Sequence, residues 1–253
     1  AISMDGANVL VREKGAKRGR PAERPGKDED LSKSSSYKNA MVGSISYYKQ
    51  IEGVIDIETG EEGKLPERIS STYHARMPED RALTFKTEFE FQVAQELDRL
   101  PESFTKILLM DGARGLWNYA ENTELFSDFR MLVDFYHASE HLSALAEALF
   151  GKSSQQAEDW YKKWRHKLKY EPGAVDGLLR SSSRYRQTGK LSKTCREQIE
   201  KEETYFKRNR LKMNYHEYVA EGLPIGSGPV EAACKTIVKA RLCQSGMRWS
   251  KAG

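Results

Sequence analysis

The chain has 253 residues, of which 38% are hydrophobic and 31% are charged, and its formal net charge is +4. A chain of this length can bury an ordinary hydrophobic core, and this balance excludes both a disordered chain and a membrane-spanning one. The spacings of Cys195, Cys234 and Cys243 are unlike a disulfide or metal framework. We therefore expect reduced thiols and a cytoplasmic protein.

The chain opens on an apolar, β-branched stretch, Ile2 to Arg12, which predicts a buried strand with Asp5 near its centre. Because the sequence lacks an initiator methionine and begins inside this strand, we expect Ala1 to be a boundary within a longer protein. Residues 15–36 are rich in Lys, Arg, Gly, Pro and Ser, which predicts a long loop. Its basic residues are candidate DNA contacts, although a solvated loop explains them equally well. They are Lys17, Arg18 and Arg20.

Four further segments in the first half have strand or helix patterns. Residues 40–48 and 51–58 are strand-like and almost contiguous, which predicts a hairpin or meander, and residues 65–75 add a third strand to it. Residues 79–100 place apolar side chains at helical spacing and stop at Pro101, which predicts a crossover helix.

The second half is mostly helical. A short strand is expected at 105–110, followed by a helix through Trp117, and another strand at 130–136. Residues 137–222 have helical periodicity almost throughout, with breaks at Gly151, at Pro172 and Gly173, and at Gly189. A last helix is expected from about residue 230 to 244.

This order of elements predicts an α/β fold, a ribonuclease-H-like mixed-sheet core interrupted by an all-α insertion. We expect residues 1–136 to form the first part of the core and residues 137–224 to form the helical insertion. Residues 225–253 would then return to the core with a glutamate-bearing helix.

The tetrapeptide Met-Asp-Gly-Ala occurs twice, at residues 4–7 and 110–113, each time attached to an apolar strand. A carboxylate in a buried strand is costly unless it is paired or binds a cation, and strand ends face the crevice where such sheets bind ligands. Converging carboxylates suit Mg²⁺ or Mn²⁺ and phosphodiester chemistry. Glu231, in the first turn of the last helix, is the candidate third ligand to Asp5 and Asp111. An ordinary helix-start glutamate is the alternative.

The runs MDGARGLW, VDFYHASEHL and GLPIGSGPVEAACKTIVKARLCQSGMRWSKAG resemble bacterial insertion-sequence transposases of the ISKra4-like group, within the DDE superfamily. The resemblance extends from SMDGANV to GMRWS. It implies metal-dependent cleavage and strand transfer of double-stranded DNA at element ends and target, by a dimer or a larger assembly. It also implies two Mg²⁺ or Mn²⁺ ions held by Asp5, Asp111 and Glu231.

Several neighbouring residues have more than one interpretation. Asp134 also closes a strand and is the main rival of Asp111, or it supports the metal site together with His137. A histidine at a helix start, held by Asp134, is an equal alternative for His137. Basic residues after Glu231 are candidate phosphate contacts near the metals. These are Lys235, Lys239, Arg241 and Arg248.

Two other function classes compete with the transposase. The sequence HASEH at residues 137–141 fits the H-x-x-E-H pattern of inverted zinc peptidases, with Glu140 as general base and Glu217 as a conceivable third ligand. That pattern is short and leaves both Met-Asp-Gly-Ala motifs unexplained. A transposase-derived DNA-binding protein without catalysis is the other alternative, and the intact set of acids argues against it.

Overall fold

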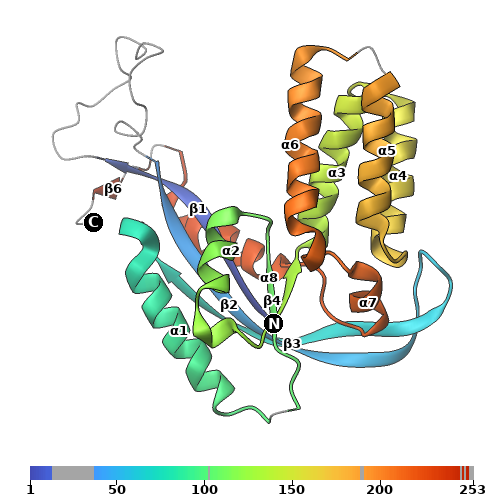
Figure 1. The fold of residues 1–253 in the computed structure, drawn as a ribbon. Helices are drawn as coiled ribbons and strands as arrows, with labels where there is room; N and C mark the ends of the chain where they lie inside the picture. The colour runs from blue at the N-terminus through green and yellow to red at the C-terminus, as the bar shows by residue number, and fades with distance from the viewer. Residues whose placement is uncertain (13–36, 102, 189–190, 246, 248, 251–253) are drawn as a thin grey trace, which may run out of the picture. The chain divides into compact units, whose positions relative to one another are not determined.

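The computed structural model of the chain describes residues 1–12, 37–101, 103–188, 191–245, 247 and 249–250 (Figure 1). These residues form two compact units, and three of the strands contribute residues to both. Unit 1 comprises Ala1–Ser3, Ile45–Ser71 and Glu102–Ser227, and unit 2 comprises Met4–Ser44, Thr72–Pro101 and Gly228–Gly253.

A mixed sheet has the strand order β3-β2-β1-β4-β5, with β6 paired to β1. Its β1–β4 and β4–β5 pairs are parallel, and β3 follows β2 in an antiparallel hairpin. This topology confirms the α/β class and is compatible with the expected ribonuclease-H-like core. The strands are β1 (Ile2–Arg12), β2 (Tyr37–Ile55), β3 (Glu62–Arg76), β4 (Ile107–Met110), β5 (Arg130–Val133) and β6 (Trp249–Ser250).

The β2–β3 hairpin differs from the sequence prediction. The expected break between residues 48 and 51 is wrong, because β2 continues through it to Ile55. The chain turns instead at residues 56–61, where the Asp56 carboxylate accepts a hydrogen bond from the Glu58 N–H at 2.8 Å and Gly60 has a φ of 73°. An Asp that caps its own turn and a glycine in the left-handed region explain why the reversal is here.

In unit 1, every described element between Phe135 and Ala220 is a helix, in agreement with the helical periodicity of residues 137–222. The breaks between α3, α4 and α5 fall near the predicted Gly151 and Pro172, and the third predicted break, at Gly189, lies outside the described residues. Helix α3 contacts both α4 and α6, and α5 contacts α4 and α6, which closes a bundle (Figure 1). The helices of unit 1 are α2 (Arg114–Glu121), α3 (Phe135–Phe150), α4 (Gln155–Tyr170), α5 (Ala174–Thr188), α6 (Lys193–Asn209) and α7 (Tyr215–Ala220), with 3₁₀ turns at Glu124–Phe126 and Arg210–Lys212.

In unit 2, helix α1 (Leu83–Leu97) follows a 3₁₀ turn at Asp80–Ala82 and buries Phe85, Phe89 and Val93. The last helix begins at Gly228, with Pro229 in its first turn as predicted. It runs as α8 (Gly228–Ala233), a π-helical segment η4 (Cys234–Lys239) and α9 (Ala240–Leu242). Among the described residues, no helix combines the length and apolar character needed to cross a membrane.

Candidate active site

Asp5 lies in the middle of β1, between the buried residues Met4 and Ala7. Its own side chain is half-buried, and its Oδ1 accepts a hydrogen bond from the Gly6 N–H at 2.6 Å. A Cβ at Gly6 would lie 2.2 Å from the Asn39 side chain, so Asn39 packs directly on this glycine. The strand therefore holds the Asp5 carboxylate at a fixed point, with tight packing on either side of it.

The last helix positions Glu231 by burying one of its faces in unit 2. Val230, Cys234 and Val238 follow the helical spacing and pack with Val9 and Val11 of β1 in one hydrophobic core. Glu231 is half-buried beside that face. The sheet and the helix together thus fix the position of the Glu231 backbone.

The thiol of Cys234 brings Asp5 and Glu231 into one neighbourhood. Cys234 is only 3% exposed, and burial raises its pKa to about 12. The negative charge of Asp5, a hydrogen bond to Asp5 and the charge of Glu231 act in the same direction. Both carboxylates therefore act on the same thiol, although they are 226 positions apart in the sequence. Two of the three predicted acids are thus brought together within unit 2.

Asp111 belongs to unit 1, where it directly follows β4. Its Oδ1 accepts a hydrogen bond from the Ala113 N–H at 2.9 Å, and its backbone carbonyl accepts one from the Trp117 indole at 2.7 Å. Next to it, the Gly112 carbonyl accepts a hydrogen bond from the Arg208 guanidinium at 2.5 Å. The second Met-Asp-Gly-Ala motif is thus held on both sides, by α2 and by α6.

The two motifs have matching positions on their strands. In unit 1, Ile2 of β1 pairs with Leu108 of β4 in parallel register. Asp5 is three residues beyond Ile2, and Asp111 is three residues beyond Leu108. Asp5 and Glu231 belong to unit 2 and Asp111 to unit 1, so the meeting of all three carboxylates stays a prediction.

Asp134 is fully buried and accepts hydrogen bonds with both oxygens. Its Oδ1 accepts from the backbone N–H groups of Tyr136 and His137, at 2.6 and 3.1 Å, and so caps helix α3. Its Oδ2 accepts from the N–H and the hydroxyl of Ser227, each at 2.5 Å. With four donors around it, this carboxylate has a structural task at the point where the chain enters the last helix.

The histidines at the start of α3 have different surroundings. His137 is half-buried, and its backbone N–H is one of the donors to Asp134. The His141 Nδ1 lies 2.5 Å from an oxygen of Glu202, and its ring stacks on Tyr205 at 3.5 Å between centroids. Glu217, the conceivable third zinc ligand, pairs with Arg130 at 3.4 Å. These contacts give the H-x-x-E-H pattern a packing role in the helical bundle.

Within the described residues, no three His, Cys, Asp or Glu side chains form a group spaced to hold a metal ion. The donor chemistry of the acids nonetheless fits a hard divalent cation, because Asp5, Asp111 and Glu231 offer half-buried carboxylate oxygens.

The predicted DNA-contact residues are only partly described. Lys235, Lys239 and Arg241 are exposed on the last helix. The Arg241 guanidinium donates to the Thr236 carbonyl at 2.6 Å, which holds it against the helix. Four further candidates lie outside the described residues, namely Lys17, Arg18, Arg20 and Arg248.

Sequence reasoning missed two residues beside Asp111, Tyr205 and Arg208 of α6. An added Cβ on Gly112 would lie 2.0 Å from the Tyr205 ring, so Tyr205 packs directly on this glycine. Arg208 reaches the Gly112 carbonyl across 96 positions of the sequence. Tyr205 and Arg208 are three positions apart on a polar helix, and nothing in that local pattern predicts their contacts with Gly112.

Comparison of the chain with protein-family models and with curated proteins finds no match. A functional assignment therefore depends on the residues, their geometry and the motifs of the sequence itself.

Proposed function

We propose that this chain is the catalytic part of a DDE transposase that cuts and joins the DNA of a bacterial insertion sequence. The observation that carries the proposal is the approach of Asp5 and Glu231 to one thiol from opposite ends of the chain. Half-buried carboxylates that lie near the same buried group are suited to share a hard divalent cation, which takes carboxylate oxygens as ligands. The motifs that resemble the ISKra4-like group contain the same acids.

For the second aspartate, the contacts favour Asp111 over Asp134. The Asp134 carboxylate already accepts four hydrogen bonds and is fully buried, which leaves it poorly suited to metal binding. Asp111 is half-buried at the end of its strand. The parallel pairing of Ile2 with Leu108 further supports a position for Asp111 on β4 equivalent to that of Asp5 on β1.

In the proposed reaction, Asp5, Asp111 and Glu231 would hold two Mg²⁺ or Mn²⁺ ions. Two such metal ions would activate the attacking oxygen and neutralise the charge on the leaving oxygen of an in-line displacement. The chain contributes placement: β1 and its packed glycine fix Asp5, the buried helix face fixes Glu231, and the Ala113 N–H orients Asp111.

The chemistry has two phosphodiester steps. Water first cleaves the bond at the element's end and leaves a 3′-hydroxyl there. That hydroxyl then attacks a phosphodiester of the target DNA, forms the new bond and releases the 3′-oxygen of the target strand. The proposed partners are double-stranded DNA and further copies of the chain, in the bacterial cytoplasm and at the nucleoid. The exposed Lys235 and Lys239 would contact phosphates near Glu231.

The test combines metal binding with DNA cleavage by this chain. Mn²⁺ binding is measured by electron paramagnetic resonance for the parent and for Asp5→Asn, Asp111→Asn and Glu231→Gln. Cleavage of DNA carrying the element's ends is measured with Mg²⁺, Mn²⁺ or EDTA. Asp128→Asn is the matched control, because Asp128 is an exposed carboxylate paired with Lys106 at 2.5 Å in unit 1.

Each of the three site variants is expected to weaken Mn²⁺ binding and to lower cleavage by at least about a hundredfold, while Asp128→Asn behaves like the parent. EDTA is expected to abolish cleavage. Tight DNA binding without metal-dependent nicking would instead support the catalytically silent DNA-binding protein. Equal Mn²⁺ binding by the parent and all three variants would refute the proposed site.

A further inference from the structure

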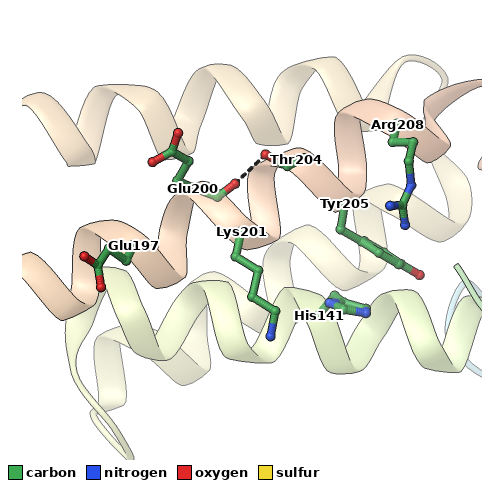
Figure 2. Close-up of a pocket in the computed structure, with 7 residues that line it drawn as sticks. All are labelled: His141, Glu197, Glu200, Lys201, Thr204, Tyr205 and Arg208. Carbon is green, nitrogen blue, oxygen red and sulfur yellow. Dashed lines mark hydrogen bonds between the residues drawn. The ribbon is translucent and has the colours of Figure 1, made fainter. Parts of the chain in front are cut away.

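A pocket of about 460 Å³ lies on the surface of the helical bundle in unit 1, between α6 and α3 (Figure 2). The lining side chains of α6 recur at intervals of three and four residues, so they share one face of that helix. Figure 2 shows Glu197 and Glu200 toward one end of the pocket and Tyr205 and Arg208 at the other. The pocket thus has an acidic end and a basic end.

The basic end of the pocket reaches the motif that contains Asp111. One guanidinium nitrogen of Arg208 donates to the carbonyl of Gly112, the residue after Asp111, at 2.5 Å. The Arg208 side chain is otherwise exposed. This hydrogen bond holds the guanidinium beside Asp111. A guanidinium has five N–H donors, so others remain for a further acceptor.

Arg208 differs from the basic residues next to it in the chain. Lys207 pairs with Glu203 at 3.5 Å, and Arg210 pairs with Asp176 at 3.1 Å. For Arg208, the described part of the chain shows a carbonyl partner and no ion pair with a carboxylate. An anchored guanidinium that forms no salt bridge within the described residues keeps N–H groups that are suited to bind an anion.

Tyr205 supplies a second observation at the same end. Its ring is packed between His141, at 3.5 Å between centroids, and Gly112. Its hydroxyl is buried and, within the described residues, has no hydrogen-bond partner. Burial raises the pKa of Tyr205, so the hydroxyl stays protonated and acts as a donor. A buried donor without a protein acceptor is uncommon, and it is free to donate to a bound group that carries an acceptor oxygen.

We propose that Arg208 and Tyr205 form a phosphate-binding site for the DNA backbone beside Asp111, with the pocket between α6 and α3 receiving the adjoining nucleotide. This inference rests on the proposed function and adds to it a role for the helical segment. The planar guanidinium would hold two phosphate oxygens, and the Tyr205 hydroxyl would donate to one of them. Contacts of this kind position DNA without reading its sequence.

The experiment compares two arginines that lie two positions apart. Arg208→Gln and Arg210→Gln remove the same charge from the same end of α6, but only the first removes the group beside Gly112. Affinity for labelled double-stranded DNA is measured by fluorescence anisotropy over a range of salt concentrations, with Ca²⁺ in place of Mg²⁺ to prevent cleavage. Arg208→Lys keeps the charge without the planar fork, and it serves as a second variant if Arg208→Gln folds poorly.

We expect Arg208→Gln to weaken DNA binding about tenfold and to reduce the slope of log affinity against log salt by about one, as for one lost phosphate contact. Arg208→Lys is expected to keep the slope and to bind less tightly than the parent. Tyr205→Phe is expected to weaken binding while its unfolding midpoint stays equal or rises, because no hydrogen bond within the protein is lost. Arg210→Gln should bind within about twofold of the parent.

Equal affinities and equal salt slopes for Arg208→Gln and Arg210→Gln would overturn this inference and leave the proposed function intact. The same holds if the Arg208→Lys and Tyr205→Phe variants bind DNA as the parent does. A parent protein that does not bind DNA at any salt concentration would overturn the proposed function and, with it, the phosphate site.

Discussion

The buried carboxylate of Asp134 accepts hydrogen bonds from both the backbone N–H and the hydroxyl of Ser227, each at 2.5 Å. Ser227 directly precedes Gly228, the first residue of the helix that carries Glu231. Beside this pair, the Phe135 N–H donates to the Ile225 carbonyl at 2.8 Å. The start of α3 therefore fixes the place where the chain leaves the helical segment, directly before the helix that carries Glu231 begins.

Ser227→Ala tests this anchor. The substitution removes a donor to a buried carboxylate, so we expect it to lower the free energy of unfolding by about 1–3 kcal/mol. Ser139→Ala is the control: Ser139 is also buried, but its hydroxyl donates only to the Phe135 carbonyl within the same helix. Its loss should cost less than about 1 kcal/mol. Urea unfolding gives both values, and equal costs for the two variants would contradict the special role of Ser227.

Gly112 and Gly115 offer a matched pair for the packing beside Asp111. A Cβ on Gly112 would lie 2.0 Å from the Tyr205 ring and 2.8 Å from the Asn209 amide, whereas a Cβ on Gly115 would meet nothing within 4 Å. We expect Gly112→Ala to destabilise the protein by roughly 1–3 kcal/mol through overpacking. Gly115→Ala, in α2, should stabilise it by about 0.5–1 kcal/mol. Thermal and urea unfolding would show the opposite signs, and a common sign would refute the packing argument.

Local sequence patterns predicted most of the strands and helices. The apolar run before Asp111 and the β-branched run around Asp5 specify strands by themselves, and the spacing of Val230, Cys234 and Val238 specifies a buried helix face. The hairpin was less predictable, because residues 48–51 are compatible with a strand or a turn. Asp56 and Gly60 determine where the chain reverses, because together they favour a turn more strongly than residues 48–51 do.

Contacts between distant parts of the chain could not be predicted in this way. Nothing local to Asp134 indicates that Ser227 supplies two of its donors, and nothing local to Arg208 indicates the Gly112 carbonyl. Those contacts depend on how α3 and α6 lie against the strands that precede them. The sequence therefore indicated which acids to consider. The structure shows that the Asp134 carboxylate already accepts four hydrogen bonds within the protein.

Substitution of His141 or His137 tests whether the H-x-x-E-H pattern packs the helical bundle or binds zinc. Glu202, 1% exposed, loses its histidine partner in His141→Ala, so we expect that variant to be destabilised by about 2–4 kcal/mol. His137→Ala should cost less than about 1 kcal/mol, because the hydrogen bond from residue 137 to Asp134 comes from the backbone N–H, which alanine keeps. Urea unfolding with and without Zn²⁺ measures both effects. Stabilisation by Zn²⁺ that depends on both histidines would revive the peptidase interpretation.

Tyr215 predicts how stability changes at alkaline pH. Its side chain is fully buried and its hydroxyl donates to the Val133 carbonyl at 3.0 Å. Burial, with smaller contributions from Tyr205, Asp134 and Tyr218, raises the pKa of Tyr215 well above its ordinary value of 10.0. Below about pH 10 the phenol is neutral in both the folded and the unfolded chain, so its full contribution to the free energy of unfolding is present. As the pH rises further, only the unfolded chain ionises, and this contribution declines by about 1.4 kcal/mol per pH unit.

Tyr215→Phe should therefore be less stable than the parent by about 1 kcal/mol at neutral pH, since it lacks the hydrogen bond to Val133. Above about pH 10 its free energy of unfolding should fall less steeply than that of the parent, so the two curves converge. Tyr136→Phe is the control, because Tyr136 is 59% exposed and its hydroxyl is solvated before and after unfolding. Urea unfolding between about pH 7 and 11 measures the curves. Parallel curves for the parent and Tyr215→Phe would show that the Tyr215 phenol ionises as readily in the folded chain as in the unfolded one.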